Sequence, residues 1–414
     1  MFRGLQSCRL CGGSFWDESL NLRETPLANE LYSNRNEAIK ADRFPLVVVM
    51  CKKCKHVQLK HIVNSNRLFS KYVYKSGTSQ TFREHFRSLA QEIALISKPG
   101  DLIIEIGSND GTLLRELAHQ KLIAVGIEPS EILVNASRSE GDNVLLGFLN
   151  EEVVRKVASK YGQAQVVIGN NVFAHIDDLS GAVRCVWDLL KNNGIFVFEV
   201  AYLGKMIEKG IFDTIYHEHM SYHSIIALKE FLSNQGFTLV DIKEIPTHGG
   251  SIRVFACKDK NLPISRKVEN FIEIERERGL DSPEIFQSMA YIVEKLRISI
   301  ASELSQLDGT EKIFGYGAPA KVVTFLSEMH LEDLPIVGVI DDNPEKQNCY
   351  LPGTGLEILS IEDMKKNLRI GDQKLICLIF PWNLSDEVLG KLRLFMPSGS
   401  AALSFFPGIN RVDF

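Results

Sequence analysis

Three of the ten histidines of this chain fall in one short stretch, TIYHEHMSYHS, at residues 214–224. They are His217, His219 and His223, and a cluster of this kind has three possible roles. It could bind a metal ion, since His219 and His223 have the i, i+4 spacing of a helical ligand pair. It could transfer protons, because the imidazole pKa lies near neutrality, or it could be a polar surface or core cluster. The order of residues does not match the HExxH pattern of helical zinc sites, which favours proton transfer.

Two CxxC pairs form a second chemical group, Cys8 with Cys11 and Cys51 with Cys54. Each pair supplies two thiolates on a tight turn, and two turns complete the closed, tetrahedral site that structural zinc prefers. The alternatives are coincidence among eight cysteines or a dithiol redox motif, although redox chemistry needs only one pair. Because a closed site leaves no open position on the metal, we expect this Zn²⁺ to support folding and not catalysis.

A glycine-containing turn, EIGSNDG, links an apolar segment to a helical pattern at residues 105–111. Glycine lets the backbone approach a ligand closely and adopt positive φ. The pattern resembles ExGxxxG of class I S-adenosylmethionine (SAM) methyltransferases more than GxGxxG of dinucleotide enzymes, whose third glycine is missing. A generic strand-turn-helix corner is the alternative. The candidate cofactor residues of the turn are Glu105, Gly107, Ser108, Asn109, Asp110 and Gly111.

Further polar residues follow later apolar segments. Glu128 ends LIAVGIE, where a carboxylate can accept both ribose hydroxyls of an adenosyl group. Asn170 and Asn171 end QVVIGNN, and His175 follows them. Because open α/β sheets bind ligands at the carboxyl ends of their strands, we expect these residues near the cofactor. The histidine-rich stretch follows another predicted strand, GIFVFEVAY, and is expected at the same edge.

The elements that must position these residues alternate between strands and helices. A helical period at residues 80–97 precedes the first strand, and the alternation that follows predicts an α/β fold with a parallel, doubly wound sheet. Residues 237–258 predict two adjacent strands as an antiparallel end to that sheet. We predict a zinc-binding domain at 1–70, a SAM-binding domain at 71–262, linking helices at 263–308 and a C-terminal Rossmann-like α/β domain at 309–414.

The C-terminal domain has a glycine turn of its own, GYGAPAK, at residues 315–321. Backbone donors, the helix dipole and Lys321 would all favour a phosphate there. Asp341 and Asp342 end the next strand, so a degraded dinucleotide site for NAD is the competing interpretation. The third glycine is missing, and we favour the diphosphate of a substrate, with Tyr316 and Lys321 as binding residues, or a structural role.

Composition narrows the class of protein. The chain has 414 residues, a net charge of −5 and a pI near 6.1, with no basic run, so nucleic acid is not an expected partner. The sequence shows neither a signal peptide nor a run of apolar residues long enough to span a membrane. We therefore expect a cytoplasmic protein with no membrane partner, and one that could function as a monomer.

Taken together and in order, several motifs resemble the zinc-containing C-methyltransferases of deoxysugar biosynthesis. They are the paired CxxC turns, EIGSNDG, YHEHMSYHS, HGGSIRVF and GYGAPAK. Members of that family methylate C-3 of nucleotide-linked 4-keto-6-deoxyhexoses, and their zinc, SAM and C-terminal domains enclose the substrate. The resemblance implies SAM as methyl donor, S-adenosylhomocysteine as product, a structural Zn²⁺ and a dTDP- or GDP-linked sugar as partner.

The resemblance also implies residue roles. A ketone at C-4 acidifies the C-3 proton, and by similarity to the family's Tyr-x-Glu-His segment His219 is the expected base. Glu218 would orient His219 or bind sugar hydroxyls, and Tyr216 would hydrogen-bond the reacting sugar. The other positions that the family pattern places at the ligands are Tyr74 and His175 at the substrate, Ser76 and Ser79 over the cofactor, and His248, Gly250, Ser251 and Arg253 at the substrate or its phosphates. The family often has alanine where Gly107 stands, a change that should leave cofactor binding intact.

Two alternatives belong to other classes. An NAD-dependent sugar-nucleotide oxidoreductase would use the C-terminal glycine turn. A non-catalytic zinc scaffold would retain only a decayed methyltransferase core, which gives no reason for Glu105, Glu128 and His219 to remain together. No motif distinguishes dTDP from GDP, an amino from a hydroxyl group at C-3, or retention from inversion.

Overall fold

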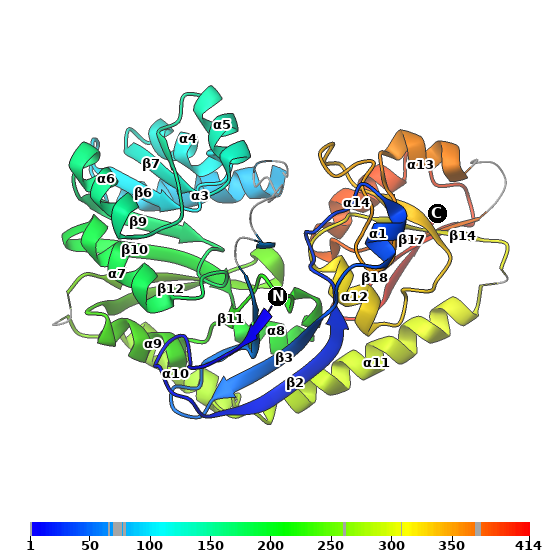
Figure 1. The fold of residues 1–414 in the computed structure, drawn as a ribbon, viewed down its shortest axis with the longest axis horizontal. Helices are drawn as coiled ribbons and strands as arrows, with labels where there is room; N and C mark the ends of the chain where they lie inside the picture. Colours follow the sequence, from blue (N-terminus) through cyan, green and yellow to red (C-terminus); the bar gives the residue numbers. More distant parts are fainter. Residues whose placement is uncertain are drawn as a thin grey trace.

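The computed structural model describes residues 2–64, 67–68, 77, 80–259, 262–307, 309–368 and 374–414. Figure 1 shows two lobes joined along the bottom of the view by N-terminal strands and by the long helix α11 (Ile285–Ser305). Within the described residues the strands form sheets of two, four, seven and six strands. The seven-stranded sheet belongs to the central unit and the six-stranded sheet to the C-terminal unit.

The central sheet has the strand order β12-β13-β10-β9-β6-β7-β8. Its members are β6 (Leu102–Ile106), β7 (Ile123–Glu128), β8 (Val144–Leu146), β9 (Ala164–Asn170), β10 (Leu190–Ala201), β12 (Thr238–Ile245) and β13 (Ser251–Cys257). All pairs from β10 to β8 are parallel, while β13 is antiparallel to both β10 and β12. The predicted doubly wound sheet with an antiparallel end is confirmed.

Helices cover both faces of this sheet because its strands are apolar on both sides. On β6, Ile103 packs into a core with α3 (Gln80–Leu95) and α4 (Thr112–His119), whereas Ile104 packs on the opposite face. Successive side chains of a strand point to opposite faces, so one apolar run serves both cores. The remaining helices of the unit are α5 (Glu131–Ser139), α6 (Glu151–Tyr161), α7 (Leu179–Leu189), α8 (Leu203–Lys209) and α9 (Ile225–Asn234).

The N-terminal sheet has the order β11-β4-β3-β2 and is antiparallel throughout. It contains β2 (Trp16–Thr25), β3 (Phe44–Cys51), β4 (Val57–Leu59) and β11 (Ser221–Tyr222). The strand β11 belongs to the histidine-rich stretch, so that stretch completes the sheet of the zinc-binding segment. Outside this sheet lie the small pair β1 (Phe2–Gly4) and β5 (His61–Val63) and the helix α1 (Arg35–Ile39).

The C-terminal sheet has the order β16-β15-β14-β17-β18-β19. Its strands are β14 (Lys312–Tyr316), β15 (Ile336–Ile340), β16 (Ile358–Leu359), β17 (Leu375–Ile379), β18 (Ala401–Ser404) and β19 (Asn410–Asp413). Its helices are α12 (Val322–Glu328), α13 (Ile361–Leu368) and α14 (Ser385–Leu392), and α10 (Arg266–Glu277) and α11 precede the unit. Both α10 and α11 lie between residues 263 and 308, and the division into domains stays a prediction.

One apolar core connects the three parts. It contains Leu46 and Val48 of β3, Phe212 just before the histidine-rich stretch, Met289 of α11 and Val322 of α12. Burial of such side chains is worth about 25 cal/mol per Å² of apolar area, so a shared core holds the units in fixed positions. No helix in the described part of the chain is both long and apolar enough to cross a membrane.

Candidate active site

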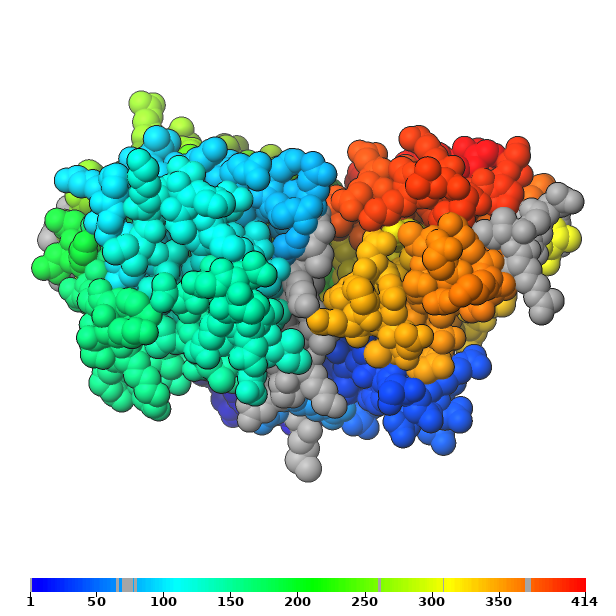
Figure 2. Space-filling model, turned by 90° about the horizontal axis from the view of Figure 1, so that it is seen from above, coloured from blue at the N-terminus to red at the C-terminus, as the bar shows by residue number. Residues whose placement is uncertain are grey.

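A cavity of about 1080 Å³ lies where the central unit, the histidine-rich stretch and the C-terminal unit meet. Seen from above, the surface is hollowed by a groove between the cyan and green lobe and the orange and red lobe (Figure 2). The predicted site residues that line the cavity are Glu105, Gly107, Ser108, Asn109, Asp110, Glu128, Asn170, Asn171, His175, Tyr216, His219, His248, Tyr316 and Lys321. Residues of two predicted ligand sites thus face one space.

The turn after β6 has a backbone that requires glycine. Gly107 has φ +67°, and a Cβ there would lie 2.5 Å from the Val172 side chain. Its N–H donates to the carbonyl of Ile127 at 2.8 Å, which ties the turn to the end of β7. The structure therefore gives a physical reason for glycine at this position.

Glu105 is buried at the carboxyl end of β6 and lines the cavity. Burial raises the pKa of its carboxyl well above the usual range, and the charges of Asp110 and Glu128 raise it further. Its Oε2 atom has no hydrogen-bond partner among the described residues. A buried acid in this state is stabilised by a ligand that brings a positive charge, and the ammonium and sulfonium groups of SAM fit that requirement.

Glu128 ends β7 and fixes the other side of the turn. Its carboxylate accepts hydrogen bonds from the backbone N–H of Asn109 at 3.0 Å and of Ser130 at 2.9 Å. Burial raises the pKa of Glu128. Asn170, at the end of β9, is aimed at the same cavity, and neither atom of its side-chain amide has a partner within the described part of the chain. These donors and acceptors suit the polar groups of an adenosyl ligand.

In the histidine-rich stretch, Tyr216 and His219 are half-buried and face the cavity, while the residues around them are buried. The Nδ1 atom of His219 lies 2.7 Å from the carbonyl oxygen of Thr214. A carbonyl only accepts, so Nδ1 carries the proton and Nε2 holds a free electron pair. The Tyr216 hydroxyl donates to that Nε2 at 2.8 Å.

The surroundings of His219 keep it neutral. Burial lowers the pKa of this imidazole to about 4, although the Thr214 carbonyl opposes the shift. The ring of His175 contacts the ring of His219 edge-on, with centroids 4.9 Å apart. At neutral pH the cavity therefore presents an unprotonated imidazole nitrogen that can accept a proton.

Glu218 is buried and does not line the cavity. Both of its carboxylate oxygens accept hydrogen bonds from the side-chain amide of Asn29, at 2.8 Å each. Burial raises the pKa of Glu218 to about 7, against the stabilising effects of Asn29 and Lys346. The hydrogen bonds that orient His219 come from Thr214 and Tyr216, so the structure does not place Glu218 as the partner that orients it.

The other two histidines of the stretch contact backbone. The Nε2 atom of His217 lies 3.3 Å from the Pro45 carbonyl, and that of His223 lies 3.3 Å from the Phe173 carbonyl. Both are buried, and burial lowers the pKa of each to about 4. Of the side chains that the structure describes, only the four cysteines form a group placed to hold a metal ion, so a metal at the histidines is not supported.

The four cysteines Cys8, Cys11, Cys51 and Cys54 have their sulfur atoms within 4.8 Å of one another. The Cys8–Cys54 and Cys11–Cys51 pairs are each 3.5 Å apart. A tetrahedral site with Zn–S bonds of about 2.3 Å needs sulfur separations of about 3.8 Å, so the residues fit a zinc ion. All four positions of such a site are protein thiolates, which supports a role in folding.

At the C-terminal glycine turn, Lys321 lines the cavity. Its ammonium lies 3.9 Å from the centre of the Trp382 ring and donates to the side-chain oxygen of Asn383 at 2.8 Å. Burial lowers the pKa of Lys321 to about 8, opposed by the charge of Asp213. Near neutral pH this group is a largely protonated, half-buried cation that lines the same cavity as Glu105.

Comparison with known proteins gives these features a family. Residues 8–69 match a zinc binding domain, 79–242 a methyltransferase domain and 246–407 a C-methyltransferase C-terminal domain. The C-methyltransferase NovU of Streptomyces niveus is 30% identical over 403 residues, which make up 96% of this chain and 94% of that protein. The chain belongs to this C-methyltransferase family. It is a SAM-dependent methyltransferase with a class I fold in its central unit and a zinc site at its N-terminus.

Two weaker matches each cover part of the chain. A carboxy-S-adenosyl-L-methionine synthase of Nautilia profundicola is 28% identical over 124 residues, 28% of this chain and 52% of that protein. The structure of magnesium protoporphyrin IX methyltransferase from Synechocystis PCC 6803 with bound SAH is 16% identical. It covers 47% of this chain and 92% of that chain, with a TM-score of 0.34.

Family membership decides between the classes left open by the sequence. The chain is an enzyme, which removes the alternative of a non-catalytic zinc scaffold. The C-terminal glycine turn lies inside the segment that matches the C-methyltransferase C-terminal domain. The match therefore does not support the oxidoreductase alternative.

Several predicted site residues of this C-methyltransferase lie away from the cavity. Arg253 is buried, and its guanidinium binds Glu199 at 2.6 Å as well as Glu92, so we do not retain it as a substrate-binding residue. The residues that do not line the cavity are Glu218, Gly111, Gly250, Ser251 and Arg253. Tyr74, Ser76 and Ser79 lie outside the described residues.

Other residues at the site of the enzyme carried no signal in the sequence. Asn29, which holds Glu218, sits in an ordinary stretch of the N-terminal segment. Lys346 lines the cavity, donates to the Ala318 carbonyl at 2.8 Å and lies 3.7 Å from Asp341. A single asparagine or lysine belongs to no motif, and only the tertiary fold brings it to the cavity.

Proposed function

We propose that this methyltransferase transfers the methyl group of SAM to C-3 of a nucleotide-linked 4-keto-6-deoxyhexose. The observation that carries the proposal is the unprotonated Nε2 atom of His219, which faces a cavity that also contains Glu105 and Lys321. A carbon nucleophile requires the loss of a C–H proton, and a neutral imidazole next to the methyl-donor site is the group that can take it.

Proton removal is assigned to His219. A C-4 ketone makes the C-3 proton acidic because the electron pair left on C-3 delocalises onto the carbonyl oxygen as an enolate. His219 Nε2 accepts this proton, while the Nδ1–H bond to the Thr214 carbonyl keeps the ring in the correct tautomer. A pKa of about 4 keeps the base unprotonated between substrates at neutral pH.

Tyr216 changes partner in this scheme. Its hydroxyl now donates to His219 Nε2, so it must turn away before that nitrogen can accept a proton from carbon. The freed hydroxyl can then donate to the developing enolate oxygen and lower its energy. His175 packs against the base and restricts its orientation.

The methyl donor and the nucleotide occupy opposite ends of the cavity. Bound SAM supplies an electrophilic sulfonium methyl group, with Glu105, Glu128 and Asn170 as the residues that hold it. Lys321 and the turn before it bind the diphosphate of the sugar nucleotide, because a half-buried cation that lines the cavity favours an anion.

Two coupled measurements test the proposal. The first is SAM consumption with a panel of dTDP- and GDP-linked 4-keto-6-deoxyhexoses, in which at least one member should turn over. The second is exchange of the C-3 proton with D₂O when S-adenosylhomocysteine replaces SAM, followed by NMR.

The variant His219→Asn should still bind S-adenosylhomocysteine and lose C-3 exchange by about 10³-fold or more, since general base catalysis contributes 10²–10⁴-fold. Tyr216→Phe should retain exchange at a reduced rate. Full exchange in His219→Asn would refute the assignment of the base, and absence of turnover with every panel member would refute the substrate class.

A further inference from the structure

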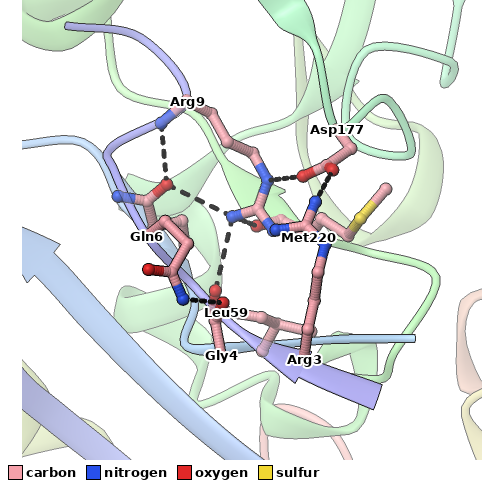
Figure 3. A network of polar contacts seen from close by, with 8 residues as sticks. Arg3, Gly4, Gln6, Arg9, Leu59, Asp177 and Met220 are labelled. Atoms are coloured by element: carbon pink, nitrogen blue, oxygen red, sulfur yellow. Dashed lines mark hydrogen bonds and ion pairs between the residues drawn. The ribbon is translucent and has the colours of Figure 1, made fainter. Parts of the chain in front are cut away.

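Arg9 stands between Cys8 and Cys11 in the first zinc-binding turn, but its guanidinium reaches into the central unit (Figure 3). The side chain is only 2% exposed. Its Nε donates to Asp177 at 3.1 Å, and its Nη1 donates to the carbonyl of Met220 at 3.2 Å. The same Nη1 lies 3.3 Å from the carbonyl of Leu59 in β4.

The partners of Arg9 flank the two histidines of the cavity. Asp177 stands two residues after His175, and Met220 directly follows His219. One buried cation therefore binds both segments whose imidazole rings lie 4.9 Å apart. A displacement of either partner would change the distance or angle between the rings.

Backbone hydrogen bonds of Met220 connect the segment that Arg9 contacts to two other parts of the chain. Its N–H donates to the carbonyl of Ala174 at 2.8 Å, and its carbonyl also accepts from the N–H of Leu59 at 3.0 Å. Ala174 is the neighbour of His175, so Met220 is held between the His175 segment and β4. Arg9 supplies the side-chain contact to that junction, and its removal would take away the buried cation that contacts both segments.

We propose that Arg9 is a positioning residue for proton transfer, which couples the geometry of the zinc-binding turn to the placement of His175 and His219. The zinc thiolates fix the backbone on both sides of Arg9, and Arg9 fixes the two histidine segments. The catalytic part of this inference rests on the proposed function, whereas the coupling of the segments does not.

Arg3 provides a matched control. It also pairs with Asp177, but its side chain is 55% exposed and it lies outside the CxxC turn. Exposed ion pairs contribute little, so Arg3→Lys should behave as the wild type. The variant Arg9→Lys keeps the charge. A single ammonium group, however, cannot reach all the separate acceptors that the forked guanidinium of Arg9 contacts.

The first test measures amide hydrogen exchange on zinc-loaded protein, with zinc content determined on the same samples. In Arg9→Lys, peptides that cover residues 172–178 and 214–223 should exchange about tenfold faster, with zinc retained. Arg3→Lys should leave both peptides unchanged. Wild-type exchange in Arg9→Lys, or faster exchange only together with loss of zinc, would overturn the proposal.

The second test separates positioning from folding. In Arg9→Lys the value of kcat should fall about 10–100-fold while the KM for SAM stays within about twofold, because a misplaced base impairs the chemical step. The variant Asp177→Asn does not change the sequence of the zinc-binding turn and should show the same pattern of kcat and KM. If Arg9→Lys does not fold, Asp177→Asn decides whether the contact positions the base. An equal loss of SAM binding and kcat would show a folding role instead. If the wild type turned over no keto sugar, the proposed function would fail, and the exchange data would still decide the role of Arg9.

Discussion

The central and C-terminal units each have a glycine after the first strand of their sheet and an acidic residue at the end of the second. Gly107 donates its N–H to the Ile127 carbonyl at 2.8 Å, and Gly317 donates its N–H to the Ile340 carbonyl at 2.6 Å. Each of these carbonyls directly precedes the acidic residue.

The acidic residues also make equivalent bonds. Glu128 accepts the N–H groups of Asn109 in the turn and of Ser130. Asp341 accepts the N–H groups of Ala318 in its turn, at 2.7 Å, and of Asn343, at 2.9 Å. The two units thus build the same backbone frame from different sequences.

The difference lies in the charges carried by the frame. Two residues before the glycine, the central unit has Glu105 and the C-terminal unit has Gly315; four residues after it, they have Gly111 and Lys321. Packing fixes these choices, since a Cβ on Gly315 would lie 2.5 Å from Phe380 and one on Gly111 would lie 2.0 Å from Asp142. One frame therefore suits a cationic ligand and the other an anionic one.

The largest expected difference between the units is in acid stability. Burial lowers the pKa of His217 and His223 to about 4, from an ordinary value near 6.5. As pH falls from 6.5 to 4, the unfolded chain binds protons that the folded chain does not, so the free energy of unfolding drops by roughly 3 kcal/mol for each histidine. Residues 309–414 contain a single histidine, His330.

Amide exchange at pH 5 and pH 7, corrected for intrinsic rates, should therefore show the N-terminal and central units loosened more than the C-terminal unit. Glu218 acts in the opposite sense, because its pKa is raised to about 7 and ionisation above pH 4.5 destabilises the fold. The variant His217→Gln isolates the histidine contribution and should flatten the pH dependence. Equal loosening of both units would contradict the comparison.

Removal of the buried acid is the next largest change. Glu105→Gln should weaken SAM binding about 100-fold, because a neutral amide cannot balance a ligand cation in a buried site. Isothermal titration with SAM measures the affinity. Asp341→Asn, which removes an acid of the C-terminal unit, should leave SAM affinity unchanged, and a similar loss in both variants would show that the two ligand sites are not separate.

Removal of Lys321 should affect the other ligand. Lys321→Met is expected to raise the KM for the sugar nucleotide about tenfold and to leave SAM affinity unchanged, since one charge-assisted contact is lost. Lys391→Met is the control: Lys391 also lines the cavity, but Asp342 binds it at 2.9 Å and Glu387 at 3.2 Å. If both lysine variants behaved alike, general charge and not Lys321 would explain substrate binding.

The two affinities should also respond to pH in opposite directions. SAM affinity should rise with pH, because Glu105 has a strongly raised pKa and must ionise to balance a cation. Affinity for the sugar nucleotide should fall above pH 8, where Lys321, with a pKa of about 8, loses its proton. The slopes are at most about tenfold per pH unit. Parallel slopes in titrations from pH 6.5 to 9 would contradict the assignment of charges.

Much of the central unit could be predicted from the sequence because its signals are local. Buried parallel strands read as continuous apolar runs, and the ends of those runs placed Glu105, Glu128 and Asn170 at one edge of the sheet. The histidine-rich stretch was expected at the same edge from its position after a strand, whereas the roles of His219 and Tyr216 came from the resemblance to the family.

The remaining features depend on contacts between distant segments. The strand β11 pairs with β4, although much of the central unit lies between the two strands in the sequence. No local pattern encodes that pairing. Asn29 meets Glu218 for the same reason, and Arg253 was misplaced because its partners Glu199 and Glu92 come from β10 and α3. The strand β2 is half-exposed over most of its length, which removes the apolar run that would have revealed it.

The most direct test of the account is the site of methylation. The enzyme, SAM labelled with ¹³C in its methyl group and the keto-sugar nucleotide that turns over should give a product in which ¹³C NMR shows the label bonded to the ring carbon next to the ketone. His219→Asn should give no labelled product above about 0.1% of the wild-type rate. Label on oxygen or nitrogen of the sugar would contradict C-methylation and the role assigned to the histidine-rich stretch.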